Sequence, residues 1–287
     1  MIISASRRTD IPADWFIKRL QEKIVCCRNP LNAKQVSQIS LSPEVVDCIV
    51  FWTKNPIPML SKLDALKEYN YYFQFTLTGY GKDIEANLPD KKKELIPAFQ
   101  KLAEEIGPEK VIWRYDPIIF NERYTEEYHL EAFRQISDSL YGYTNKCVFS
   151  FVDIYQKNQK SMEQLHRTEI SNQQIYEFAE KLYKISSSKR MELATCAEKI
   201  DLSALGIQHN ACIDRKVIEK ICGAHLKIDK DKTQRDECQC VASVDIGAYN
   251  TCCNGCKYCY ANYSEQSVRN NVSRYNSDSV ILCDEIT

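Results

Sequence analysis

Short apolar segments alternate with longer amphipathic ones along most of the chain, and this pattern limits the fold more than any other feature. Six segments rich in β-branched and aromatic residues are predicted strands: Ile2–Ser6, Cys48–Thr53, Tyr71–Thr78, Lys110–Tyr115, Lys146–Val152 and Met191–Cys196. Five segments between them are predicted helices: Ala13–Glu22, Ile57–Lys67, Lys91–Ile106, Glu126–Leu140 and Asn172–Ser186. Such alternation is typical of a parallel sheet with right-handed crossovers. The glycine motifs G-x-G-x-x-G and G-x-x-x-x-G-K-S/T are absent, so we expect an α/β fold with a parallel barrel or partial barrel.

Each predicted strand runs into a cluster of polar or charged residues. In a parallel barrel the carboxyl ends of all strands open at one mouth, where active sites form. The clusters supply predicted catalytic residues that would grip a carboxylate or phosphate, or balance one another: Arg7, Arg8, Asp10, Lys54, Arg114 and Asp116. Asp153 and Glu198 are predicted to contact a cofactor, for example its ribose hydroxyls. The alternative for each residue is an ion pair that seals the barrel top.

Composition and charge exclude several classes of protein. The chain has 38 Lys and Arg residues against 39 Asp and Glu residues, and this balance argues against a basic nucleic-acid-binding protein. A membrane-spanning helix needs about 20 apolar residues, and no such run occurs. The first residues lack the basic-then-apolar order of a signal peptide, so we expect a cytoplasmic protein. The run Lys91-Lys92-Lys93 is a predicted solvated face, whereas Trp15, Trp52 and Trp113 are predicted core residues.

Cysteines are unusually frequent and unevenly placed. Of the 14 in the chain, eight lie between Cys212 and Cys259. In a reducing compartment such clusters are more often metal or iron–sulfur ligands than disulfides. The densest group is Cys252, Cys256 and Cys259, spaced C-x-x-x-C-x-x-C. Three such thiolates can hold three irons of a 4Fe-4S cluster and leave the fourth open. A structural zinc site, completed by Cys253 or by the pair Cys238-x-Cys240, and buried free thiols are the alternatives.

This spacing resembles the signature of the radical S-adenosylmethionine (radical SAM) superfamily. The resemblance implies that the open iron binds S-adenosylmethionine, that an electron from the cluster cleaves it, and that the resulting 5′-deoxyadenosyl radical abstracts a hydrogen atom from the substrate. Tyr258, just before the third cysteine, is then a predicted cofactor-binding residue. In ordinary members the loop follows the first barrel strand near the N-terminus.

The position of the loop near the C-terminus therefore predicts a circular permutation. Val241–Ala248 would be the usual first strand and Ser264–Tyr275 the usual first helix, and the chain would resume at Ile2–Ser6. This arrangement predicts that Met1 lies beside the end of that helix. It also predicts that the cysteine loop lies at the same mouth as Arg7, Arg114 and Asp116.

Five motifs further resemble a bacterial domain-of-unknown-function family, number 1848, which is regarded as radical-SAM-like and has its cysteine motif at the C-terminus: Ser4–Pro12, Phe51–Pro56, Phe75–Tyr80, Trp113–Pro117 and Cys256–Asn262. The resemblance covers the whole chain and implies the fold and the cofactor, but no reaction. Cys253 departs from the expected proline. We expect one domain over residues 1–287, with a cysteine-containing insertion at 197–241 and the permuted strand, loop and helix at 242–275.

The remaining cysteines fall into two predicted groups. Four of them supply enough thiolates for a second, auxiliary 4Fe-4S cluster, with a structural zinc ion or simple buried thiols as alternatives: Cys196, Cys212, Cys238 and Cys240. Five others lie in apolar or helical contexts and are predicted to pack in the core: Cys26, Cys27, Cys48, Cys147 and Cys222. The polar tail from residue 276 to 287 is predicted to fray.

Together these features predict a radical SAM enzyme that acts on an unidentified, small anionic substrate or a terminal residue. Its electron donor would be a protein such as flavodoxin or ferredoxin. One alternative is a non-catalytic iron–sulfur or zinc protein that binds nucleic acid or a protein partner, although a net charge of −1 does not favour duplex binding. A barrel hydrolase with a structural metal is the weakest alternative, because the sequence shows no histidine cluster for a catalytic zinc and no nucleophile elbow.

Overall fold

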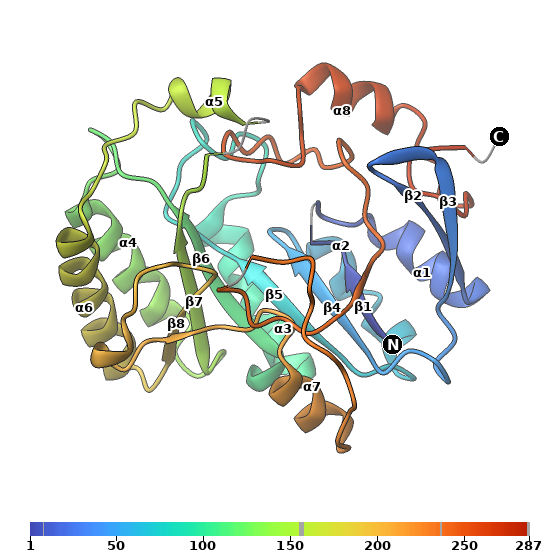
Figure 1. Ribbon diagram of the computed structural model, residues 1–287, viewed down its shortest axis with the longest axis horizontal. Helices are drawn as coiled ribbons and strands as arrows, with labels where there is room; N and C mark the ends of the chain where they lie inside the picture. The colour runs from blue at the N-terminus through green and yellow to red at the C-terminus, as the bar shows by residue number, and fades with distance from the viewer. Residues whose placement is uncertain (8, 155–157, 236, 286–287) are drawn as a thin grey trace.

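The computed structural model describes residues 1–7, 9–154, 158–235 and 237–285. In these residues the central element is a sheet of eight parallel strands, which forms a partial barrel (Figure 1). Its strands, in sheet order, are β10 (Val244–Asp245), β1 (Ile2–Ala5), β4 (Cys48–Thr53), β5 (Tyr71–Thr76), β6 (Val111–Ile118), β7 (Lys146–Phe151), β8 (Glu192–Thr195) and β9 (Gln208–His209). The predicted α/β fold with a parallel sheet is confirmed.

Helices connect the strands on the outer side of the sheet. The main ones are α1 (Ala13–Glu22), α3 (Ile96–Ile106), α4 (Glu126–Ser139) and α6 (Asn172–Ser188). Shorter helical elements are α2 (Ile57–Leu60), η1 (Leu63–Leu66), η2 (Lys91–Leu95), η3 (Pro108–Lys110), α5 (Gln159–Glu163), η4 (Ser203–Leu205), α7 (Arg215–Cys222) and α8 (Glu265–Val272). The predicted helix 57–67 is split into α2 and η1, because Lys62 leaves helical dihedral angles (φ −122°, ψ 5°).

The two faces of the sheet are covered differently, because successive side chains of a strand point to opposite sides. The outer face packs aromatic and aliphatic side chains against the helices; Trp113, for example, stacks on Phe133 of α4 at 4.7 Å between ring centroids. The inner, concave face is filled by α7 and the segment between β9 and β10, which crosses it in Figure 1. Several cysteines of that segment belong to this inner packing.

A hairpin that the sequence analysis missed follows α1. Its strands β2 (Ile24–Asn29) and β3 (Asn32–Ser40) pair antiparallel beside the main sheet. The C-terminal segment packs against this hairpin, since the Cys26 amide donates a hydrogen bond to the Val280 carbonyl at 2.7 Å. Ile281, Leu282 and Cys283 are buried. The predicted fraying of the tail is therefore wrong for this segment, because its apolar run covers β2.

The last strand lies beside the first. β10 pairs in parallel with β1, with Ile3 opposite Val244. The loop after β10 and α8 both lie at the carboxyl end of the sheet (Figure 1). The Met1 ammonium instead binds the Val45 carbonyl, at the opposite end. The predicted position of Met1 beside the end of α8 is thus wrong. All residues of α8 are described and none is buried, because the helix lacks an apolar face broad enough to cover the sheet.

In the part of the chain that the structure describes, no helix is both long enough and apolar enough to cross a membrane.

Candidate functional site

The cysteine loop, residues 250–262, follows β10 and closes on itself. The Asn250 amide donates to the Ala261 carbonyl at 2.9 Å, and the Asn262 amide side chain donates to the Cys252 carbonyl at 2.7 Å. Gly255 permits the turn between Cys253 and Cys256, because its φ of 67° is rare for other residues. Cys252, Cys256 and Cys259 are half-buried, whereas Cys253 is exposed.

A second loop, residues 84–87, braces the cysteine loop. Glu85 forms an antiparallel bridge with Cys256, and the Lys257 amide donates to the Ile84 carbonyl at 2.9 Å. The Asn87 side chain donates to the Cys253 carbonyl at 2.8 Å. Residues 84–87 follow β5 in the chain, so this brace fixes the cysteine loop from the side of that strand.

Glu85 is the centre of a buried ionic network that sequence reasoning missed. Its carboxylate accepts hydrogen bonds from Lys54 Nζ at 3.1 Å, from Thr78 Oγ1 at 2.9 Å, from Lys91 and from the Tyr258 hydroxyl. Burial alone would raise the pKa of Glu85, but the two ammonium groups lower it to about 2.

The same network determines the state of the two lysines. Burial opposes the charge of Lys54, but Glu85 outweighs it and raises the pKa of Lys54. Lys54 Nζ lies 5.1 Å from the centre of the Tyr258 ring. The prediction that Lys91 belongs to a solvated face is wrong, because its ammonium is drawn inward by Glu85; Lys92 and Lys93 are exposed as predicted.

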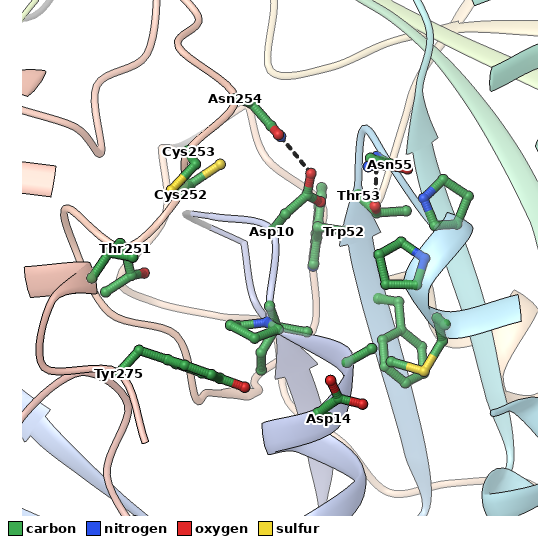
Figure 2. A pocket seen from close by; sticks show the side chains of 18 of the residues that line it. Asp10, Asp14, Trp52, Thr53, Asn55, Thr251, Cys252, Cys253, Asn254 and Tyr275 are labelled. Atoms are coloured by element: carbon green, nitrogen blue, oxygen red, sulfur yellow. Dashed lines mark hydrogen bonds between the residues drawn. The ribbon is translucent and has the colours of Figure 1, made fainter. Parts of the chain in front are cut away.

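Asp10 connects the cysteine loop to the end of β4. Its carboxylate accepts the backbone N–H of Lys54 at 3.0 Å and the side-chain amide of Asn254 (Figure 2). Burial raises the pKa of Asp10, although these hydrogen bonds oppose the shift. Asp10 therefore acts as an anchor between two neighbouring segments of the mouth.

A cavity of about 400 Å³ lies beside this anchor. Figure 2 shows Cys252 and Cys253 on one wall and Asp14 and Tyr275 on another. Among the described residues that line it, none is basic. Such a cavity does not offer the charge that the predicted anionic substrate requires, and that substrate stays a prediction.

The four cysteines predicted for an auxiliary site come together on the concave face. Cys196 Sγ lies 3.3 Å from Cys212 Sγ, and Cys240 Sγ accepts the Ile213 amide at 3.3 Å. Cys238 lies beside Cys240 and is buried. The Cys212 carbonyl is fixed by the side chains of Tyr72 and Gln74, at 2.7 and 2.8 Å.

Two arginines flank these cysteines. Arg114 is buried; its guanidinium forms an ion pair with Asp116 and donates to Cys212 Sγ at 2.8 Å. The guanidinium carbons of Arg7 and Arg114 lie 5.4 and 5.3 Å from the Trp52 ring centre. Trp52 is thus half-buried on the concave face between charged groups, not in the apolar core that was predicted, whereas Trp15 and Trp113 are core residues. Arg8 lies outside the described residues.

The chain matches one protein family over most of its length. Residues 2–261 match the model of a family described as Domain of unknown function (DUF1848). The chain belongs to this family. The match includes the concave-face cysteines and all cysteines of the loop, but not α8. No curated protein and no solved structure matches the chain significantly.

The predicted cofactor contacts of this DUF1848 member lie at the mouth and have protein partners. Asp153 accepts from Arg235 at 2.6 Å, and Glu198 accepts the Phe151 amide at 2.8 Å. Burial raises the pKa of Glu198 to about 7. Their contact with a cofactor stays a prediction.

The cysteines predicted to pack in the core of this DUF1848 member follow that prediction in part. Cys26, Cys48 and Cys147 are buried, whereas Cys27 and Cys222 are only partly so.

The thiols of the DUF1848 cysteine loop suit a metal cluster in donor chemistry. Burial raises the pKa of Cys256 to about 12 and also raises that of Cys252 and Cys259, so without metal they are neutral thiols. A bound metal would replace their protons. Among the described residues, no group of three or more His, Cys, Asp or Glu side chains is arranged to hold a single metal ion. A cubane cluster makes a different demand, because its cysteines each bind a different iron.

Proposed function

We propose that this protein is a radical SAM enzyme whose 4Fe-4S cluster is held by Cys252, Cys256 and Cys259. One observation carries the proposal: the loop with these three thiols lies at the carboxyl ends of a parallel sheet, where active sites of such folds form. The donor set also fits. Three cysteines with C-x-x-x-C-x-x-C spacing leave one iron of the cluster without a protein ligand. The permuted connection is part of the proposal, and the parallel pairing of β10 with β1 supports it.

When bound, the cluster and S-adenosylmethionine would supply a 5′-deoxyadenosyl radical after one-electron reduction, and this radical would take a hydrogen atom from the substrate. The chain's own residues would hold and orient these groups. Lys54, whose charge acts on the Cys256 thiol, would meet the carboxylate of S-adenosylmethionine. Glu85 keeps Lys54 charged and directs its ammonium toward the ring of Tyr258.

The brace at residues 84–87 would protect the reaction from water. It holds the cysteine loop with backbone hydrogen bonds, and the contact of Asn254 with Asp10 ties the loop to the end of β4. A fixed, covered loop limits the access of solvent to a reactive radical. Loosening the brace should therefore uncouple cofactor cleavage from substrate reaction.

The test is a 5′-deoxyadenosine assay under strict anaerobic conditions. The protein is reconstituted with ferrous iron and sulfide and is given S-adenosylmethionine and dithionite as the electron source. We expect 5′-deoxyadenosine and methionine to form. Cys252→Ala, Cys256→Ala and Cys259→Ala should each abolish the product, because a site with two cysteines cannot retain the cluster.

Cys253→Ala is the matched control. It removes a neighbouring thiol of the same loop, but this thiol is exposed and has no role in the proposed cluster. It should retain iron and product formation. A wild-type protein that binds stoichiometric zinc, or that binds an iron–sulfur cluster but never cleaves S-adenosylmethionine, would instead support the non-catalytic alternative.

A further inference from the structure

The described cations that the sequence assigned to an anionic group differ in what they already bind. Arg114 is occupied, because its Nε and Nη2 both donate to the carboxylate of Asp116. Lys54 is occupied by the carboxylate of Glu85, at 3.1 Å. Arg7 is different, because part of its guanidinium meets no acceptor among the described residues. Of these three cations, Arg7 is therefore the one with donors left for a ligand.

The open donors of Arg7 are Nε and Nη2, and both atoms are buried. These two nitrogens lie on one edge of the guanidinium and direct their N–H groups side by side. Such a fork matches the two oxygens of a carboxylate. Arg114 shows the filled form of the same fork, since its Nε and Nη2 each take one oxygen of Asp116. The empty fork of Arg7 thus indicates an acceptor with two oxygens.

A third donor stands beside this fork. The guanidinium carbon of Arg7 lies 5.4 Å from the centre of the Trp52 ring. The indole Nε1 of Trp52 is also buried and has no hydrogen-bond partner in the described part of the chain. A buried N–H without an acceptor is costly, and native proteins rarely leave several on neighbouring side chains. Arg7 and Trp52 together therefore point to a bound acceptor group.

The charges around Arg7 distinguish a carboxylate from a phosphate. Asp245 and Asp231 both act on the Arg7 charge, but neither accepts from Nε or Nη2. Asp245 accepts the backbone N–H of Arg7 at 2.9 Å, and Asp231 accepts the amide and the hydroxyl of Thr233. A phosphate dianion would bring two negative charges toward these acidic groups, whereas a carboxylate brings one. The smaller repulsion favours the carboxylate.

The segment before β10 lies over this part of the concave face (Figure 1). A charge on its Cys238 or Cys240 would act on the Arg7 guanidinium, so both thiols lie close to it. Between residues 223 and 243, the described part of this segment contains no helix or strand. Such a segment opens locally at a lower cost than a strand of the sheet. Because the fork is buried, a ligand reaches it only when part of this segment moves aside.

We propose that Arg7 and Trp52 form a binding site for a carboxylate group, with the Arg7 fork on its two oxygens and the indole N–H as a third donor. The site narrows the predicted anionic substrate to a molecule that carries a carboxylate. That assignment to the substrate rests on the proposed function, whereas the binding of a carboxylate does not. Arg114 and Lys54 then hold protein carboxylates and leave the ligand to Arg7.

The first experiment titrates the full, metal-free chain with sodium acetate and sodium propanoate at constant ionic strength. Trp52 should report binding through its fluorescence, whereas Trp15 and Trp113 are fully buried in the outer core. We expect a saturable change with a Kd of about 1–10 mM, and a Kd for inorganic phosphate at least about tenfold higher. No saturable change with either carboxylate up to about 100 mM, or tighter binding of phosphate, would overturn the proposal.

The second experiment tests the geometry of the donors. Arg7→Lys keeps the charge but lacks the fork, so it should weaken acetate binding by about tenfold. Trp52→Phe keeps a ring but removes the N–H, and calorimetry should show binding weakened by about threefold. Arg123→Lys is the matched control, because this exposed arginine also lies beside a ring, 5.5 Å from the centre of Tyr124. Equal affinities in Arg7→Lys and the parent would overturn the proposal.

These measurements need neither iron nor S-adenosylmethionine, so a failure of the proposed function would leave their outcome unchanged. Conversely, a protein that forms 5′-deoxyadenosine but binds no carboxylate in the titration would remove this inference and keep the proposed function. Carboxylate binding by a protein that never cleaves S-adenosylmethionine would keep the site and remove its assignment to a radical SAM substrate.

Discussion

Toward their carboxyl ends, the two faces of strands β4, β5 and β6 carry opposite kinds of chemistry. The outer face presents Phe51, Phe73 and Trp113, all buried in one continuous aromatic and aliphatic core. The next residue of each strand points inward and is Trp52, Gln74 or Arg114, where individual hydrogen bonds and charges prevail. At this end of the strands the outer face stabilises the fold through apolar packing, and the inner face presents polar and charged groups.

The largest expected effect is on the outer face. Trp113 is fully buried, stacks on Phe133, and donates its indole N–H to the Leu77 carbonyl at 2.8 Å. Trp113→Ala should lower the free energy of unfolding of the metal-free protein by about 3–5 kcal/mol. Urea denaturation measures this loss, with Tyr141→Ala, at an exposed position, as the control. A loss below about 1 kcal/mol would contradict the role of the outer face as the main source of stability.

A pH-dependent effect should come from His129 of α4, also on the outer face. Its Nδ1 accepts the Tyr115 hydroxyl at 2.9 Å, and its Nε2 donates to the Ile119 carbonyl at 3.0 Å. Burial lowers the pKa of His129 from 6.5 to about 4. The unfolded chain therefore takes up this proton at a higher pH than the folded one. The stabilising contribution is complete above pH 6.5 and falls by up to about 3 kcal/mol as the pH drops to 4.

Denaturation curves between pH 4.5 and 7.5 would reveal this slope. His129→Gln should flatten it, because glutamine does not titrate, even though the variant is less stable at neutral pH. A slope that persists unchanged in His129→Gln would assign the pH dependence to other groups.

A smaller loss of stability is expected for Lys91 at the mouth, and its neighbour Lys92 serves as the control. Lys91→Met removes one of the two cations on the buried carboxylate of Glu85 and should destabilise the protein by about 2 kcal/mol, since Lys54 still compensates the charge. Lys92→Met, at the adjacent exposed position, should cost less than about 0.5 kcal/mol. Equal losses would mean that the network does not stabilise the mouth.

The smallest effect on stability should come from the inner face. Arg114→Met/Asp116→Leu replaces a buried ion pair by apolar side chains of similar volume, and the metal-free protein should stay within about 1 kcal/mol of the parent. Arg114→Met alone should cost more, because it leaves Asp116 without its cation. A large loss in the double variant would show that the ion pair itself stabilises the fold.

The sequence predicted the strands and the mouth well, because both depend on local patterns. Strongly apolar segments mark β1, β4, β5, β6, β7 and β8, and polar residues follow each of them. This rule places Asp10, Lys54 and Arg114 correctly at the inner or carboxyl end of the sheet. The sequence analysis also grouped Cys196, Cys212, Cys238 and Cys240, which the structure brings together on the concave face.

Other features depend on contacts between distant residues and left no local trace. Glu85 stands in an ordinary polar loop, and only the folded chain brings it to Lys54 and Tyr258. Lys91 reads as part of a surface run, yet the tertiary contact with Glu85 draws it inward. The hairpin and the buried tail did leave signals that were missed: a turn at Asn29-Pro30 between β-rich segments, and the apolar run at residues 280–283.

The parallel pairing of β10 with β1 has a consequence for the order of assembly. Strands β4 to β8 pair with neighbours in the chain, whereas Ile3 must find Val244 across almost the whole sequence. Contacts between such distant residues close slowly, because they carry the largest loss of chain entropy. We therefore expect the cysteine loop to take its shape after the sheet has formed. If the loop holds the proposed cluster, its insertion would follow this step, and a defect in β1 would first be seen as lost iron, before any loss of secondary structure.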